Sequence, residues 1–201
     1  LGRKSVGEIV YGSWPADYSA QIIEPEMKAL HRERSIACMK AVMKTAEDFG
    51  VTVNLEIVNR FEHYLINTVD EGLEFCKEID SPNCKLLLDC FHMNIEEDDI
   101  EQSIEKAADY IGYFHVSEPN RKVPNTCAHI NWKAIGNALK KTGYDGAVVL
   151  EPFYKFGGEQ GHNMRMWRNL DKDLSMENRL RIAAQGIEYI KTQFEEGKNA
   201  K

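Results

Sequence analysis

Short apolar runs alternate along the chain with longer stretches in which apolar residues recur every three or four positions. The short runs cover residues 6–11, 51–58, 85–89, 112–116 and 146–151. Most are continuously apolar, as in parallel strands that are buried on both faces. The longer stretches predict helices over residues 25–49, from Thr68 onward, and over residues 98–110, 131–142 and 175–195. This repeated alternation predicts an α/β fold with a parallel sheet.

Local signals support some of these boundaries. Gly50 follows the first predicted helix and favours its termination there. Thr68 and Glu71 have the spacing of a capping box, which opens the next helix. The glycines between residues 157 and 161 predict a loop after the last strand. Because no linker or low-complexity segment divides the chain, we expect one domain over residues 1–201.

Composition and charge narrow the class of protein. The chain is 43% hydrophobic and 28% charged, which is typical of a globular domain with one sizeable core. A net charge of −7 argues against nucleic acid as a partner, since a phosphate-binding face needs clustered Lys and Arg. No apolar run approaches the roughly 20 residues that cross a membrane, so we expect no membrane partner.

The cysteines indicate a reducing compartment. Their number is odd and no two of them form a C-x-x-C pair, which argues against a disulfide framework or a zinc ribbon. We therefore expect reduced thiols and a cytoplasmic location. The five cysteines are Cys38, Cys76, Cys84, Cys90 and Cys127.

Acid or imidazole side chains stand at or near the ends of four successive predicted strands: Glu56, Asp89, His115 and Glu151. The intervals of 33, 26 and 36 residues (89−56, 115−89, 151−115) each fit about one βα unit. In a barrel such strand ends converge on one mouth. Any one of the four is explained equally well as a helix cap, a loop residue or a packed ring. Because all four residues occupy the same position relative to their strands, a cation site is favoured. Three carboxylates and one imidazole are ligands that suit Mn²⁺, Mg²⁺ or Co²⁺.

Four longer motifs around these residues resemble the ketose 3-epimerase family, which includes D-tagatose and D-psicose (D-allulose) 3-epimerases and belongs to the xylose-isomerase-like barrels. The motifs are residues 55–62, 88–97, 114–121 and 149–153. The resemblance implies a (β/α)₈ TIM barrel of which this chain covers about the last five βα units. Since the chain starts with Leu1, we expect the first three units to belong to a longer protein, with residues 1–201 as its C-terminal portion.

The resemblance also implies roles for individual residues. The implied ligands of one divalent ion, Mn²⁺ or Co²⁺ with Mg²⁺ as an alternative, are Glu56, Asp89, His115 and Glu151. Glu56 and Glu151 are also the implied catalytic pair. The implied substrate-binding residues are Glu62, His92 and Arg121 around the O1–O3 end of the sugar, and Trp14 and Phe153 as aromatic pocket members. A homodimer or homotetramer is implied as well.

The function that follows from the resemblance is inversion of C3 in a free ketohexose, through an enediolate with one Glu on each face of C3. D-Psicose/D-fructose and D-tagatose/D-sorbose are the implied substrate pairs. Two departures concern the substrate side: Cys90 stands where the family often has Thr, and residues 125–132 replace a segment that is often glycine-rich. The alternatives are an aldose–ketose isomerase or related sugar enzyme of the same barrel class, or a non-catalytic sugar-binding fragment.

Overall fold

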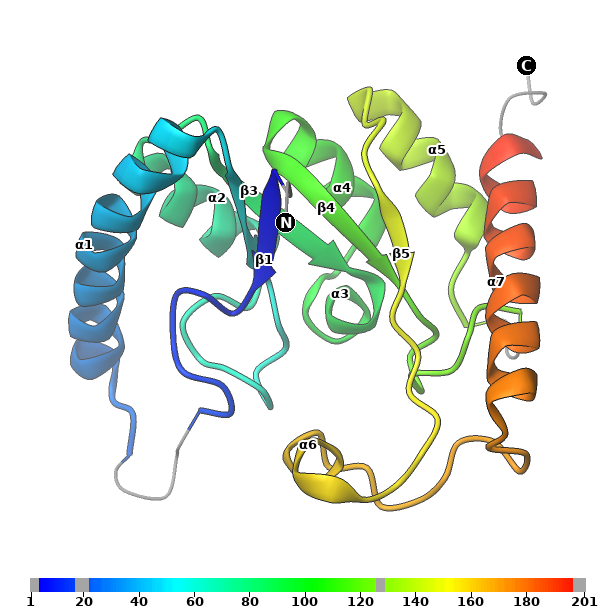
Figure 1. Ribbon diagram of the computed structural model, residues 1–201. Helices are drawn as coiled ribbons and strands as arrows, with labels where there is room; N and C mark the ends of the chain where they lie inside the picture. The colour runs from blue at the N-terminus through cyan, green and yellow to red at the C-terminus, as the bar shows by residue number, and fades with distance from the viewer. Residues whose placement is uncertain (1–3, 17–21, 126–128, 197–201) are drawn as a thin grey trace.

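The computed structural model describes residues 4–16, 22–125 and 129–196 (Figure 1). The elements in chain order are β1 Ser5–Glu8, α1 Pro25–Phe49, β2 Thr52–Glu56, α2 Val69–Ile79, β3 Cys84–Asp89, α3 Cys90–Glu96, α4 Ile100–Ala107, η1 Ala108–Tyr110, β4 Ile111–Val116, α5 Trp132–Thr142, β5 Val148–Leu150, α6 Gly158–Asn163 and α7 Met176–Glu196. The five strands form one sheet in sequential order, and each neighbouring pair is parallel. The predicted parallel α/β fold is therefore confirmed.

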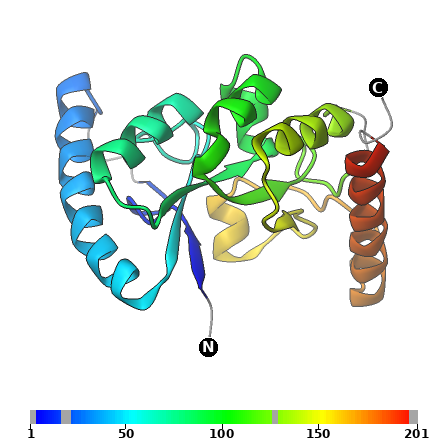
Figure 2. The same cartoon turned by 90° about the horizontal axis from the view of Figure 1, so that it is seen from above.

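The sheet curls like part of a barrel wall. Viewed from above, α1, α2, α4, α5 and α7 follow its outer side in an arc, and the inner side carries no such layer (Figure 2). In Figure 1 the strands run downward, and the short helix α6 lies below their C-terminal ends. This curled five-stranded sheet with outer helices is the partial TIM barrel that the sequence predicts.

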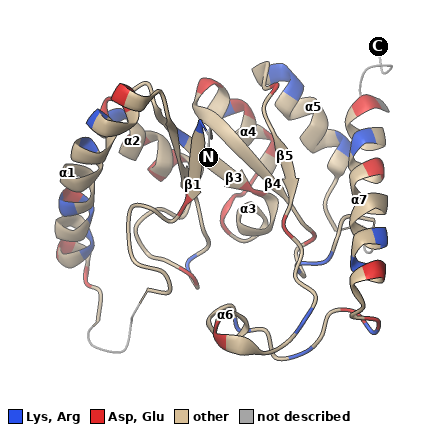
Figure 3. Cartoon of the chain, in the orientation of Figure 1, with Lys and Arg blue, Asp and Glu red and all other residues tan. Residues whose placement is uncertain are grey.

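The core lies between the sheet and the outer helices. Leu86 and Leu88 of β3 and Phe114 of β4 have no solvent exposure, and Trp132 closes the layer at the start of α5. Burying each of these side chains contributes roughly 1.5–3 kcal/mol relative to leaving it in water. Charged residues gather on the outer helices and near the lower strand ends (Figure 3). In the described part of the chain, no helix is both long and apolar enough to cross a membrane.

Two helices begin and end as their local signals predict. The α1 helix ends at Gly50, which adopts the left-handed conformation with φ 60°. At the start of α2, the Glu71 N–H donates to Thr68 Oγ1 over 3.3 Å, as in a capping box. In a regular capping box the Glu71 side chain accepts from the Thr68 N–H. Here Glu71 Oε2 accepts instead from the N–H of the preceding residue, Asn67.

The main differences from the prediction lie near the strand ends. β1 stops at Glu8 rather than at residue 11, because Glu8 has a φ of 132° and leaves the extended conformation. The helix predicted over residues 98–110 corresponds to α4 and η1, whereas α3 was not predicted. It starts directly after β3, since the Asp89 side chain caps it by accepting from the Phe91 N–H. The predicted glycine loop contains the short helix α6.

An irregularity between β3 and β4 sets which side chains face the inner side. Leu86 pairs with Ile111 but Leu87 pairs with Tyr113, so Gly112 is an extra residue in β4. A Cβ atom at Gly112 would overlap Asn54 Oδ1 and lie 2.6 Å from Lys85 Cβ, so only glycine fits. Beyond this bulge Asp89 pairs with His115. If β4 paired regularly from Ile111 onward, with Gly112 opposite Leu87, Phe114 would lie beside Asp89 instead.

The buried position of β3 gives a stability prediction. Leu88→Ala should lower the free energy of unfolding by about 2–5 kcal/mol, because it opens a cavity in a fully buried layer. Leu180→Ala is the matched control, since Leu180 on α7 is 64% exposed, and should change stability by less than about 0.5 kcal/mol. Urea unfolding of both variants measures the difference. Equal losses would contradict the assignment of the core.

Candidate metal and substrate site

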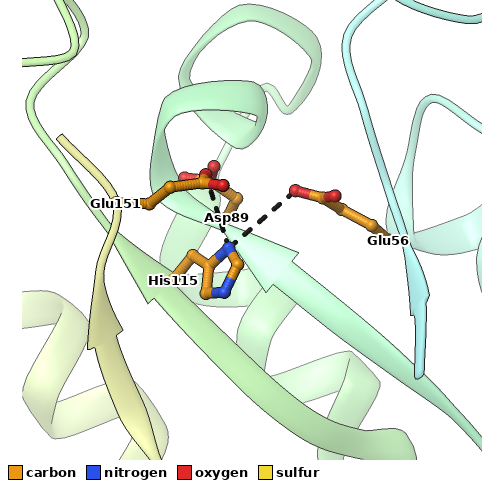
Figure 4. A group of neighbouring side chains, drawn as sticks. All are labelled: Glu56, Asp89, His115 and Glu151. Carbon is orange, nitrogen blue, oxygen red and sulfur yellow. Dashed lines mark ion pairs between the residues drawn. The ribbon is translucent and has the colours of Figure 1, made fainter. Parts of the chain in front are cut away.

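Glu56, Asp89, His115 and Glu151 meet at the C-terminal ends of β2 to β5. Each offers one ligand atom, and the four atoms lie within 4.8 Å of one another. Figure 4 shows Glu56 and Glu151 approaching from opposite sides, with His115 between them. His115 Nδ1 lies 3.4 Å from Glu151 Oε2 and 3.9 Å from Glu56 Oε1. The spacing pattern in the sequence therefore corresponds to one cluster in space.

The cluster is short of positive charge. Burial is the main factor that raises the pKa of Glu56 well above its usual value, and repulsion from Asp89 and Glu151 raises it further. His115 Nδ1 is buried and makes no hydrogen bond, because the nearby carboxylate oxygens are too far away or poorly aligned. A crowded carboxylate and an unpartnered imidazole nitrogen are the donors that a divalent cation would satisfy. The residues present therefore fit such an ion.

Arg121 supplies part of the missing charge. Its Nη1 donates to Asp89 Oδ2 and to Glu151 Oε2, each over 2.7 Å. Burial alone would raise the pKa of Asp89, but the positive charge of Arg121 and contacts with His92 hold it below its usual range. The guanidinium carbon lies 3.8 Å from the ring centre of Phe91 and 4.7 Å from that of Phe153. Two rings thus hold the guanidinium in place.

Backbone bonds explain why Arg121 reaches this position. Arg121 adopts a left-handed conformation with φ 59°, which is uncommon outside glycine. Its N–H donates to the Glu118 carbonyl over 2.7 Å, and its own carbonyl accepts from the Phe153 N–H over 2.8 Å. The buried Glu118 side chain in turn accepts from Trp132 Nε1 over 3.0 Å. This structural role of Glu118 could not be predicted from the sequence.

A cavity of about 300 Å³ adjoins the cluster. That volume is at the small end of ligand pockets and suits a small molecule. Seven of the nine predicted site residues line it: Trp14, Glu56, Glu62, His92, Arg121, Glu151 and Phe153. Asp89 and His115 adjoin it through the cluster. Gln160 and Met164, which the sequence analysis did not single out, extend the lining from α6 and the residue after it.

The predicted substrate-binding residues also contact one another. Trp14 Nε1 donates to Glu62 Oε2 over 3.3 Å, and the Asn59 N–H donates to His92 Nδ1 over 3.0 Å. His92 Nε2 lies 3.1 Å from Arg121 Nη2. Burial lowers the pKa of His92 to about 3, so its ring is neutral at physiological pH. The structure brings Glu62, His92 and Arg121 together on one side of the cavity.

Glu8 was missed by the sequence analysis. It ends β1, next to Glu56 at the end of β2, and it lines the same cavity. Although Glu8 keeps solvent contact, desolvation raises the pKa of its carboxyl group, and repulsion from Glu151 adds to the increase. A hydrogen bond with the Glu56 carboxyl group acts in the opposite direction. All five strands therefore carry an acid or an imidazole at their C-terminal ends.

The strain at Glu8 gives a second stability prediction. A non-glycine residue at a φ of 132° costs of order 1–3 kcal/mol, and glycine there loses only about 0.5–1 kcal/mol in chain entropy. Glu8→Gly should therefore raise the free energy of unfolding by about 1 kcal/mol. Glu8→Gln is the control, because it removes the charge and keeps the strain, and should give a smaller gain. If urea unfolding finds both variants equally stable, backbone strain at this position is not significant.

Comparisons with known proteins agree with this architecture. A family model described as a xylose isomerase-like TIM barrel matches residues 4–192. The chain is 47% identical over 165 residues to the D-psicose 3-epimerase of Ruminiclostridium cellulolyticum, covering 82% of this chain and 55% of that protein. It is 34% identical over 199 residues to the L-ribulose 3-epimerase of Methylomonas sp. strain DH-1, covering 96% of this chain and 64% of that protein.

A solved structure of D-psicose 3-epimerase with D-tagatose from Clostridium cellulolyticum H10 matches with a TM-score of 0.89 at 42% identity. The match covers 94% of this chain and 64% of that one. The chain thus spans between 55% and 64% of the length of these relatives. It belongs to the xylose isomerase-like TIM barrel family, within the group of its ketose 3-epimerase relatives.

Proposed function

We propose that the protein is a metal-dependent epimerase that inverts C3 of a free ketohexose. The observation that carries the proposal is the approach of Glu56 and Glu151 from β2 and from the end of β5, on two sides of one cavity. Inversion of a carbon centre by proton transfer needs one acid/base group on each face of that centre. Two carboxyl groups that flank a small polar cavity meet this need.

Glu56, Asp89, His115 and Glu151 would hold the ion. An oxygen-rich set with one imidazole suits Mn²⁺ or Co²⁺, with Mg²⁺ as an alternative. When bound, a divalent cation supplies Lewis acidity that polarises the C2 carbonyl and stabilises negative charge near it. The unpartnered Nδ1 of His115 supports its role as the nitrogen donor.

The chemical step needs only proton transfers by the two carboxyl groups. One carboxylate takes the C3 proton, and the electron pair of the C–H bond forms the C2–C3 double bond of an enediolate while the π pair of the C2 carbonyl moves to O2. The opposite carboxyl group then gives a proton to C3 on the other face as the carbonyl re-forms, so the configuration inverts. Burial supports a role of this kind for Glu56, because a raised pKa brings a carboxyl group closer to neutral pH, where it can act as acid and as base.

Arg121, His92 and Glu62 would bind the O1 and O2 end of the sugar. They offer a fixed cation, a neutral imidazole and a carboxylate on one side of the cavity. Hydroxyl groups donate to carboxylates and accept from guanidinium, so this set suits a neutral polyol. Trp14 and Phe153 add aromatic surface for the C–H faces of a sugar.

The names of the relatives support ketoses as the substrate class. D-Psicose 3-epimerase and L-ribulose 3-epimerase are the names of proteins that are 47% and 34% identical to this chain. We propose D-psicose/D-fructose or D-tagatose/D-sorbose as the interconverted pairs. We propose this activity for the whole protein that contains these five strands.

We further propose a cytoplasmic homodimer or homotetramer. The Sγ atoms of Cys76 and Cys84 lie 3.5 Å apart as separate thiols, which suits a reducing compartment. Phe61 and Trp167, which are 74% and 60% exposed, are large apolar side chains of the kind that subunit contacts cover. Cys127 lies outside the described residues.

The first functional prediction concerns Glu151. Glu151→Gln should keep the fold and lower epimerisation by about 10²- to 10⁴-fold, because the amide cannot exchange a proton with C3. Incorporation of deuterium from D₂O at C3 of D-psicose and D-fructose measures the loss in the Mn²⁺-supplemented protein. Glu74→Gln, on the exposed face of α2, is the matched control and should turn over as the unaltered protein does.

Three outcomes would contradict the proposal. Exchange at C1 rather than at C3 would indicate an aldose–ketose isomerase. Full turnover in Glu151→Gln with metal bound would show that Glu151 does not transfer the proton. Sugar binding without any exchange in the unaltered protein would indicate a non-catalytic sugar-binding protein.

The second prediction links metal binding to pH. Because burial raises the pKa of Glu56, its carboxyl group holds a proton above pH 4.5 that a bound cation must displace. Mn²⁺ should therefore bind more tightly as pH rises from 5 towards the raised pKa, by up to about tenfold per pH unit for one released proton. Calorimetric titration in two buffers of different ionisation enthalpy counts that proton. An affinity that does not depend on pH would rule out a protonated Glu56.

A further inference from the structure

We propose that Glu8 is a specificity-determining residue whose carboxylate accepts a hydrogen bond from the C4 hydroxyl group of the ketose. This inference rests on the proposed function, since it assumes that C3 of a ketose lies between Glu56 and Glu151. Three observations support it: the backbone strain at Glu8, the charge that surrounds its side chain, and its place in the row of strand ends.

Backbone strain at Glu8 needs a compensating role. Its φ of 132° lies in a region that non-glycine residues rarely adopt. The neighbouring turn maintains it, because the Val10 N–H donates to the Glu8 carbonyl over 2.8 Å. Glycine would adopt this conformation without strain, and yet the position carries a glutamate. Strained non-glycine residues concentrate at functional sites, where the side chain rather than the backbone is required.

The charge around Glu8 argues in the same direction. Its carboxyl group interacts with those of Glu56 and Glu151, so a further negative charge is added to a cluster that already repels itself. The hydrogen bond with the Glu56 carboxyl group uses part of the accepting capacity of Glu8. A carboxylate has two oxygens and about four acceptor positions, so accepting capacity remains for the hydroxyl groups of a sugar in the cavity that Glu8 lines.

The order of the strands locates what Glu8 can reach. Glu8 ends β1 and Glu56 ends β2, whereas His92 and Arg121 follow β3 and β4. Glu8 is therefore on the side of Glu56 away from His92 and Arg121, two of the three residues assigned to the O1 and O2 end. Ile9, the next residue in the chain, also lines the cavity. A ketose with C3 next to Glu56 would place C4, one carbon farther along, towards Glu8.

Glu8 stands beside the metal cluster rather than within it. The four ligand atoms within 4.8 Å of one another come from Glu56, Asp89, His115 and Glu151, and Glu8 is not a member of that group. Its role therefore differs from that of a fifth ligand, and the two roles are separable by experiment. A ligand would affect the affinity for the ion, whereas a hydroxyl-binding residue would affect only sugars that carry the hydroxyl group.

The test compares D-fructose with 4-deoxy-D-fructose, which lacks the C4 hydroxyl group. Binding of each sugar to the Mn²⁺-loaded protein is measured by calorimetry, and deuterium exchange at C3 is measured separately. The unaltered protein should prefer D-fructose by about 10- to 100-fold, the range for a hydrogen bond to a charged group. Glu8→Gly relieves the strain and should therefore fold. In this variant the affinities for the two sugars should be within threefold of each other. Its affinity for Mn²⁺ should be within threefold of that of the unaltered protein.

Glu159→Ala on α6 is the control, because Glu159 is exposed and does not line the cavity. This variant should keep the preference for D-fructose.

Retention of that preference in Glu8→Gly would overturn the inference. A tenfold loss of Mn²⁺ affinity with equal losses for both sugars would also overturn it, in favour of a metal ligand. If the unaltered protein binds D-fructose without C3 exchange, the proposed function fails, and the binding ratio still decides the role of Glu8. If it binds neither sugar, the inference fails as well.

Discussion

Repulsion between carboxylates at one mouth of the sheet is the constraint on which the rest of the site depends. Parallel strands bring their C-terminal ends together, so acids on neighbouring strands are forced into one small region. Arg121 neutralises part of this charge, and its own position depends on the turn from Glu118 and on the rings of Phe91 and Phe153. The same excess of negative charge that destabilises the cluster is what a bound cation would neutralise.

The parallel α/β fold and the four residues of the cluster could be predicted because they follow from periodicity, whereas the barrel and the substrate-binding residues came from the family resemblance. Strand ends recur about once per βα unit, so the sequence alone indicates that four titratable residues lie at corresponding strand ends. Glu8 escaped notice because the apolar run continues to Tyr11, and only the backbone conformation of Glu8 reveals that β1 has already ended. Helix α3 was missed because its cap, Asp89, was assigned to the metal cluster and not also to helix initiation. Glu118 could not be found, since its partner Trp132 is fourteen residues away in sequence.

The two edge strands of the sheet, β1 and β5, contribute different residues to the site. Val6 of β1 and Val148 of β5 are partly exposed at strands that pair on one side only among the described residues. Glu56, Asp89 and His115 come from β2, β3 and β4, which pair on both sides, whereas Glu151 follows β5, which is an edge strand. Glu8 lies on the other edge strand, β1. A substitution at Glu8 would therefore disturb less strand pairing than one at Glu56, Asp89 or His115.

The bulge at Gly112 has a consequence for how this sequence can change over evolutionary time. Surface loops of such barrels tolerate insertions and deletions, but β4 does not share that freedom. Gain of one residue between Gly112 and His115 would turn the imidazole towards the apolar layer that Phe114 now fills, and bring a phenyl ring beside Asp89. A single-codon insertion in this strand would thus exchange the two faces of its C-terminal half. Length, as much as residue identity, is under selection there.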